Sequence, residues 1–132
     1  MRSTLYKILT ATCLIILAFN FTASAQNFDV IAASFKTGDA SGLAKHFEGN
    51  VEITIKNAGT SYSKSQAEMV LKSFFTTHQP KTFAIAHQGT SPEGSKYFIG
   101  NLSTSTGNYR TYVYAKANGN NLTIQEIRFE EQ

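Results

Sequence analysis

The hydrophobic positions of this chain repeat with a helical period in its N-terminal half and with a period of two in its C-terminal half. The apolar residues of segment 28–35 stand at i, i+3, i+4 and i+7, the spacing that gives a helix one buried face. Asn27 lies where an N-cap is expected, and Gly38 lies where the helix would end. The pattern therefore predicts a first helix that begins after Asn27.

A second, shorter helix and a hairpin are predicted directly after it. Asp39 is placed to cap this helix, the apolar residues between Leu43 and Phe47 form its buried face, and Gly49 is placed to end it. Residues 51–56 then alternate between apolar and polar, which is typical of a half-buried strand. Residues 57–62 supply a turn and a short returning strand.

A capping box predicts the start of a third helix. Ser63 and Gln66 have the S-x-x-Q spacing in which each side chain bonds the backbone amide of the other residue. The apolar residues from Ala67 to Phe75 continue the helical period, and Pro80 limits the helix at its C-terminal end.

Four strands connected by hairpins are predicted from residue 81 onward, because alternating segments are separated by turn residues such as Gly, Asn and Pro. Helices followed by strands indicate an α+β fold, with three helices packed on one face of a curved, mainly antiparallel sheet. The four predicted strands are Lys81 to Gly89, Lys96 to Thr104, Tyr109 to Lys116 and Leu122 to Glu130.

Strand alternation assigns each side chain to one of two sheet faces. Phe83, Ile85 and His87 are expected to share a face, and on the last strand the even-numbered residues 122–128 oppose the odd-numbered residues 123–129. Parity leaves open which face is concave. Since both faces carry apolar groups, we expect a homodimer that covers the face away from the helices.

The N-terminus has the composition of a secretory signal. Arg2 and Lys7 supply positive charge, residues 13–21 form an apolar run, and residues 23–25 read Ala-Ser-Ala, a small-x-small cleavage site. The apolar run is shorter than the ~20 residues that span a bilayer, so a membrane anchor is not expected. We expect residues 1–25 to be removed and a single domain, residues 26–132, to reach the periplasm or the medium of a Gram-negative type cell.

The intact mass of the exported protein tests this signal. It is expected to match a chain that begins at Gln26, with or without cyclisation of that residue to pyroglutamate. A mature product that retains residues 1–25 would contradict the cleavage prediction.

Charge and cysteine content exclude several functions. Of 12 basic side chains, two lie in the signal, so ten remain against nine acidic ones and the net charge of residues 26–132 is +1. These charges are scattered and form no basic stripe, which argues against nucleic-acid binding. Cys13 is the only cysteine and would be lost with the signal, so no disulfide, thiolate nucleophile or cysteine metal site is expected.

The order α-α-β-β-α-β-β-β-β, with the Gly-Asp helix junction in Phe35 to Asp39 and the strand entry Asn50 to Ile53, resembles the nuclear-transport-factor-2-like superfamily. This resemblance implies a cone with a pocket between the helices and the concave sheet face. Because none of the motifs of its enzymatic members matches here, it assigns no catalytic residue. Three C-terminal phrases resemble a family of exported bacterial proteins known only as a domain of unknown function: Lys96 to Gly100, Tyr109 to Val113 and Ile124 to Glu130.

Few residues are candidates for chemistry. His87 is the best acid/base candidate, since it stands among apolar strand residues, whereas His46 and His78 are expected to face solvent. No histidine or carboxylate spacing indicates a metal site, and no cofactor is expected.

Tyr109, with Tyr112 and Tyr114, is a candidate sugar-binding or partner-binding platform or an ordinary cross-strand group. The expected ligand-binding residues are Phe74, Ile85, His87, Tyr97, Tyr112 and Tyr114.

Three functions follow from these observations. The first is an exported, non-catalytic protein that binds a small apolar or amphipathic ligand, or a protein partner, in its cavity or on its sheet. The second is a small enzyme of isomerase, dehydratase or hydrolase type that uses His87 and a pocket tyrosine. The third is a structural dimer. A cavity lined by His87, a tyrosine and a carboxylate would favour the enzyme, and an all-apolar cavity would favour ligand binding. A filled core with a self-complementary sheet face would favour the dimer.

Overall fold

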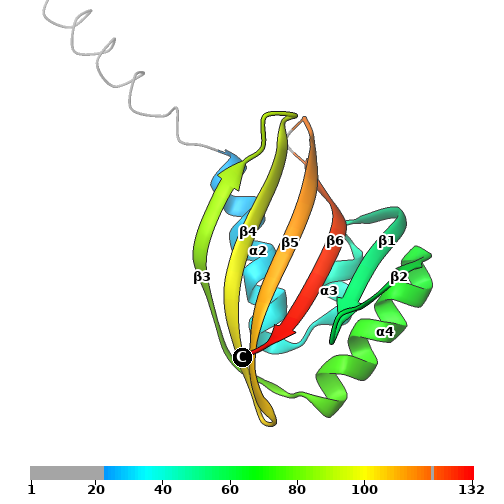
Figure 1. The fold of residues 1–132 in the computed structure, drawn as a ribbon. Coiled ribbons are helices and arrows are strands. Elements are labelled where there is room, and N and C mark those ends of the chain that lie inside the picture. The colour runs from blue at the N-terminus through cyan, green and yellow to red at the C-terminus, as the bar shows by residue number, and fades with distance from the viewer. Residues whose placement is uncertain (1–22, 120) are drawn as a thin grey trace, which may run out of the picture.

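The computed structural model describes residues 23–119 and 121–132. These residues form helices on one side of a six-stranded sheet, in the predicted α-α-β-β-α-β-β-β-β order (Figure 1). None of the helices in this described part is long and apolar enough to cross a membrane. The elements are α2 (Ala23–Thr37), α3 (Ala40–Ala44), β1 (Phe47–Ile55), β2 (Ala58–Tyr62), α4 (Lys64–Thr77), β3 (Pro80–Thr90), β4 (Ser95–Thr104), β5 (Gly107–Asn118) and β6 (Asn121–Glu131).

The first described helix is longer than its apolar pattern predicted. The described part of α2 already begins at Ala23, so Asn27 lies inside the helix and is not its N-cap. The Ala-Ser-Ala sequence that suggested a cleavage site also contains alanines, the strongest helix formers, which explains the extension. The signal prediction concerns residues 1–25, of which residues 1–22 lie outside the described residues. At its other end α2 stops at Gly38, whose positive φ of 67° suits glycine.

The second helix ends earlier than expected. Asp39 caps α3 as predicted, its Oδ1 accepting a hydrogen bond of 2.9 Å from the amide of Gly42. Phe47 does not belong to this helix, since it begins β1 and pairs with Ile124 of β6. Gly49 has φ of 71° and lies inside β1, at an irregularity in the pairing between Phe47 and Glu52. The apolar residue at 47 fits either period, and sheet pairing decides between them.

The capping box of α4 forms as predicted. The amide of Gln66 donates to Ser63 Oγ at 3.4 Å, and the amide of Ser63 donates to Gln66 Oε1 at 3.2 Å. The helix ends at Thr77, before Pro80 begins β3.

The sheet has the strand order β2-β1-β6-β5-β4-β3. Strands β3 to β6 form an antiparallel meander, and the β1–β2 hairpin joins it through a parallel pairing of β1 with β6. In Figure 1, α2 and α3 lie behind the sheet, α4 lies beside β1 and β2, and the face of β3 to β6 that is turned to the viewer carries no helix. We call the covered side the inner face and the other side the outer face.

Two irregularities in the ladders correct the predicted faces. The register of β3 against β4 shifts between Ile85 and His87, so Phe83 and Ile85 contact the core while His87 moves to the outer face opposite Ile99. The register of β5 against β6 shifts at Tyr114, so Ile124 and Ile127 are both buried although their parity differs. A β-bulge adds one residue to a strand and thereby reverses the parity of all residues beyond it.

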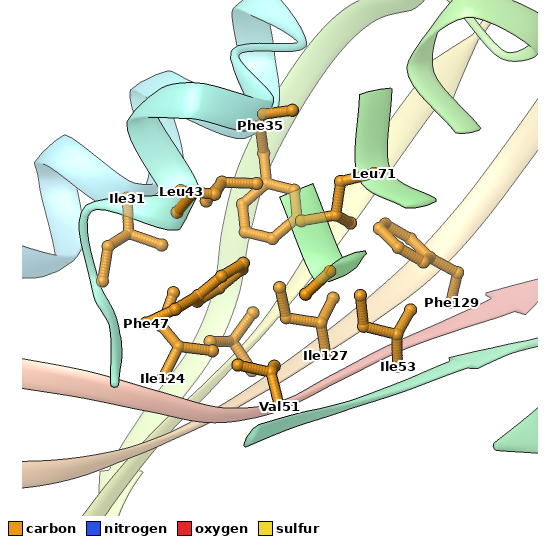
Figure 2. Close-up of a cluster of buried hydrophobic side chains, with 14 of the residues drawn as sticks. Ile31, Phe35, Leu43, Phe47, Val51, Ile53, Leu71, Ile124, Ile127 and Phe129 are labelled. Atoms are coloured by element: carbon orange, nitrogen blue, oxygen red, sulfur yellow. The ribbon is translucent and has the colours of Figure 1, made fainter. Parts of the chain in front are cut away.

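Aromatic side chains fill the space between the helices and the inner face. Phe35 of α2 is fully buried and points down onto the sheet residues in Figure 2. Its ring centroid lies 5.1 Å from that of Phe83, 6.3 Å from Phe98 and 6.1 Å from Phe129. From α4, Phe74 stacks on Phe129 with centroids 4.1 Å apart. The space in which the superfamily resemblance implies a pocket is therefore occupied by phenylalanine rings.

Candidate binding surface

The structure divides the six residues predicted to bind a ligand between the two sheet faces. Phe74 is a core residue with 5 % of its surface exposed, and Ile85 packs against the core from β3. The other four, His87, Tyr97, Tyr112 and Tyr114, belong to the outer face, as the strand registers place them. The six residues therefore do not line one pocket, and only the outer-face group forms a continuous surface.

Tyr109 separates in the same way from the predicted tyrosine platform. It lies on the inner face, is 2 % exposed, and its hydroxyl is 3.3 Å from Nδ1 of His78. The ring of His78 lies 4.7 Å from Phe74, and its Nδ1 is also hydrogen-bonded to Thr106 Oγ1. His78 is therefore a partly buried structural histidine, contrary to the expectation that it faces solvent.

The outer face is built around three tyrosines, Tyr97, Tyr112 and Tyr114, which we call the tyrosine cluster. Tyr97 of β4 and Tyr114 of β5 are directly paired, and their ring centroids are 6.0 Å apart with 33° between the planes. Tyr112 stands beside Ile99 of β4 in the next outer row. Tyr114 is 38 % exposed and is one of the large apolar side chains that the described chain leaves most open to water.

Gly89 of β3 leaves room for the ring of Tyr97. A Cβ built at position 89 would lie 2.7 Å from the Tyr97 hydroxyl oxygen and 2.8 Å from its Cζ, so only a glycine lets the ring lie across β3. In this position the Tyr97 hydroxyl is 3.3 Å from Nε2 of His87. The pair is exposed on the outer face, and no carboxylate is bonded to either member among the described residues.

Two arginines flank Tyr112. The guanidinium carbons of Arg110 and Arg128 lie 5.6 Å and 5.9 Å from the Tyr112 ring centroid, within the range of cation–π attraction. Arg128 is also held by an ion pair of 2.7 Å with Glu126, and this hydrogen bond raises the pKa of the Arg128 guanidinium above its ordinary value. Simple alternation puts Glu126 and Arg128 on the same face as Ile124, but the bulge in β6 between Ile124 and Glu126 moves the ion pair to the outer face.

The outer face carries charges of both signs. By register and alternation it carries the cations Arg110, Lys116 and Arg128 and the acidic residues Glu48, Glu52, Glu126 and Glu130. This face has aromatic residues and arginine at its centre and charges of both signs around them. Such a composition is typical of protein interfaces.

Two polar depressions lie at the end of the β5–β6 hairpin, away from the tyrosine cluster. One, of about 520 Å³, is lined in part by His46, Glu48 and Asn118, and the other, of about 390 Å³, by Glu48, Lys116 and Gln125. Neither includes a residue that the sequence predicted to bind a ligand. Within residues 23–119 and 121–132 no group of three or more His, Cys, Asp or Glu could hold a metal ion.

Comparison with known proteins agrees with the fold and leaves the activity open. Residues 28–130 match the family described as "Domain of unknown function (DUF4783)". A crystal structure of a DUF4783 protein from Bacteroides uniformis is similar with 31 % identity and a TM-score of 0.73, covering 79 % of this chain and 95 % of that one. One from Bacteroides fragilis has 27 % identity and a TM-score of 0.73, covering 78 % and 96 %. No curated protein matches this sequence.

The wider fold is that of the nuclear-transport-factor-2-like proteins. An NTF-2-like protein of unknown function from Silicibacter pomeroyi aligns at 9 % identity with a TM-score of 0.58, covering 83 % of this chain and 93 % of that one. At this identity the likeness concerns the fold alone. The resemblance to a family of unknown function is therefore confirmed, and the chain has the nuclear-transport-factor-2-like fold that the other resemblance implied.

Proposed function

Since this chain belongs to the DUF4783 family, whose function is unknown, we propose that it is a non-catalytic binding module that works through the outer face of its sheet. The observation that carries this proposal is the contrast between the two faces. Phenylalanines fill the inner face, whereas the tyrosine cluster and its arginines stay open on the outer one. The predicted signal supports export, so the module would act outside the cytoplasm.

The occupant that the outer face fits best is a second copy of the chain. Because the face carries charges of both signs, two copies can meet with the arginines of one copy against acidic groups of the other. At ~4.8 Å between strands and ~3.3 Å per residue, the six strands give a face of roughly 900 Å². That is close to the ~800 Å² per partner of a standard stable interface. A two-fold axis would make the contact isologous.

Sedimentation equilibrium at micromolar concentration tests this proposal. The expected mass is twice that of the chain, and Tyr112→Ala is expected to weaken the dimer by about 30-fold or more, the effect of removing a central interface residue. Met69→Ala is the matched control, because Met69 is 67 % exposed on α4, on the side of the molecule away from the outer face.

The possible outcomes distinguish a second copy on the outer face from other arrangements. Equal weakening by Met69→Ala and Tyr112→Ala would show that the copies associate elsewhere. A single species at the monomer mass would overturn the second-copy proposal and leave the outer face to a partner of different chemistry.

A further inference from the structure

We propose a second site, inside the molecule between α2 and β3, that takes a small neutral aromatic compound with one hydrogen-bonding group when the Phe83 ring swings away from the inner face. It lies on the opposite side of the sheet from the tyrosine cluster and does not depend on the dimer. Three features of the inner face carry it: the position of Phe83, the glycine beneath its ring and an unpaired buried hydroxyl.

Phe83 occupies a space that the sheet itself leaves empty. Its ring covers Gly100 of β4, where a Cβ would collide with the ring tip. From above, the ring is stacked on Phe35 with centroids 5.1 Å apart and 24° between the planes, and Phe98 meets it edge-on at 6.1 Å. A slot for one flat ring is therefore built into the fold by Gly100, Phe35 and Phe98.

A polar group stands at the end of this slot. Thr111 of β5 is directly paired with Gly100 and is fully buried. Its Oγ1 has no hydrogen-bond partner among the described residues. Directly opposed residues of an antiparallel pair have Cβ positions about 5 Å apart, so a ring that covers Gly100 lies beside the Thr111 side chain. A buried hydroxyl without a partner is costly, and a ligand that bonds it would remove this cost.

Phe83 can leave the slot without unfolding the sheet. It stands on β3, an edge strand, and is only partly buried, whereas Phe35 and Phe98 are completely buried. A side-chain rotation at an edge moves the ring toward solvent and leaves the ladder between β3 and β4 in place. Because the slot is open for only a fraction of the time, the apparent affinity for a ligand is the affinity of the open slot multiplied by that fraction.

The surroundings set the chemical class of the ligand. The buried residues of the described chain include no charged side chain, and the slot is lined by aromatic rings. A charged compound would lose its hydration without a partner and is excluded. A threonine hydroxyl both donates and accepts, so a phenol fits, with its ring in the place of Phe83 and its hydroxyl bonded to Thr111.

A titration followed by two-dimensional amide NMR tests the site, with phenol and benzene as probes of the same ring size. In the wild-type protein, phenol at millimolar concentration is expected to shift the amide signals of Gly100 and Thr111, and to bind about tenfold more tightly than benzene. Phe83→Ala is expected to strengthen the binding of both probes. Thr111→Val is expected to abolish the preference for phenol while keeping the binding of benzene.

Each contrary result overturns the proposal. Binding to Phe83→Ala but not to the wild type would mean that the cavity exists only when it is engineered. A preference for phenol that persists in Thr111→Val would mean that the hydroxyl is not the anchor. The dispersion of the same spectra reports whether each variant is folded, and the sedimentation experiment separately decides the fate of the dimer.

Discussion

Replacing Phe74 by alanine is expected to lower the free energy of unfolding by about 3–5 kcal/mol, the usual range for a buried phenylalanine. The Phe74 ring is stacked on Phe129 at 4.1 Å and meets Tyr109 at 5.3 Å, so its loss leaves a cavity where α4 packs on the sheet. Urea unfolding at one fixed protein concentration measures the change, because the stability of a self-associating chain depends on its concentration.

Met69 on the same helix provides the control for this prediction. Met69→Ala removes a side chain of similar apolar character that is 67 % exposed, and it is expected to change the stability by less than about 0.5 kcal/mol. A cost below about 1 kcal/mol for Phe74→Ala would contradict the prediction, since it would mean that the aromatic packing between α4 and β6 contributes little to stability.

Two threonines of the inner face are expected to respond in opposite directions to the same substitution. Thr111→Val removes a buried hydroxyl that has no partner among the described residues, and it is expected to stabilise the protein by about 1–3 kcal/mol. Thr104→Val is expected to destabilise it by a similar amount. The Thr104 hydroxyl donates to the Gly107 carbonyl at 2.8 Å and accepts from the Thr106 amide at 3.2 Å, and valine can do neither.

This pair controls for shape and for β propensity, because both changes replace one β-branched residue by another in a strand. Thermal unfolding of the two variants against the wild type decides the signs. A loss of stability in Thr111→Val would contradict this prediction, because it would show that the Thr111 hydroxyl has a hydrogen-bond partner in solution.

The sequence was sufficient for the elements and their order because each carried a local signal. The capping box at Ser63 and the hairpin turns after Thr90 and Thr104 are local features, and local features are what a periodicity argument can see. The predictions were less accurate for the start of the first described helix and for Phe47, which was assigned to a helix and lies in β1. At Phe47 the helical and the strand patterns agree, and pairing with β6, more than seventy residues along the chain, selects the strand.

The candidate surface was predicted only in part, for a geometric reason. Alternation is reliable within an unbroken strand, but a single bulge at Ile85 moved His87 to the other face and separated it from Phe83. Arg128 was assigned to the wrong face because a bulge precedes it in β6, whereas alternation within β5 correctly puts Arg110 on the same face as Tyr112 and Tyr114. The glycine at position 89 was a detectable clue, since a glycine inside a strand marks a close approach, here that of Tyr97.

The parallel contact between β1 and β6 governs the order in which this chain can fold. Phe47 is paired with Ile124, so the two partners are 77 positions apart in the sequence (124 minus 47). The β1–β2 hairpin and α4 are complete long before β6 has been synthesised, yet they have no strand to join until then. Contacts so distant along the chain require closure of a long loop and are formed late. The nascent protein would therefore remain open until its last eleven-residue strand is available, and a chain that stops before Asn121 would leave both β1 and β5 as exposed edges.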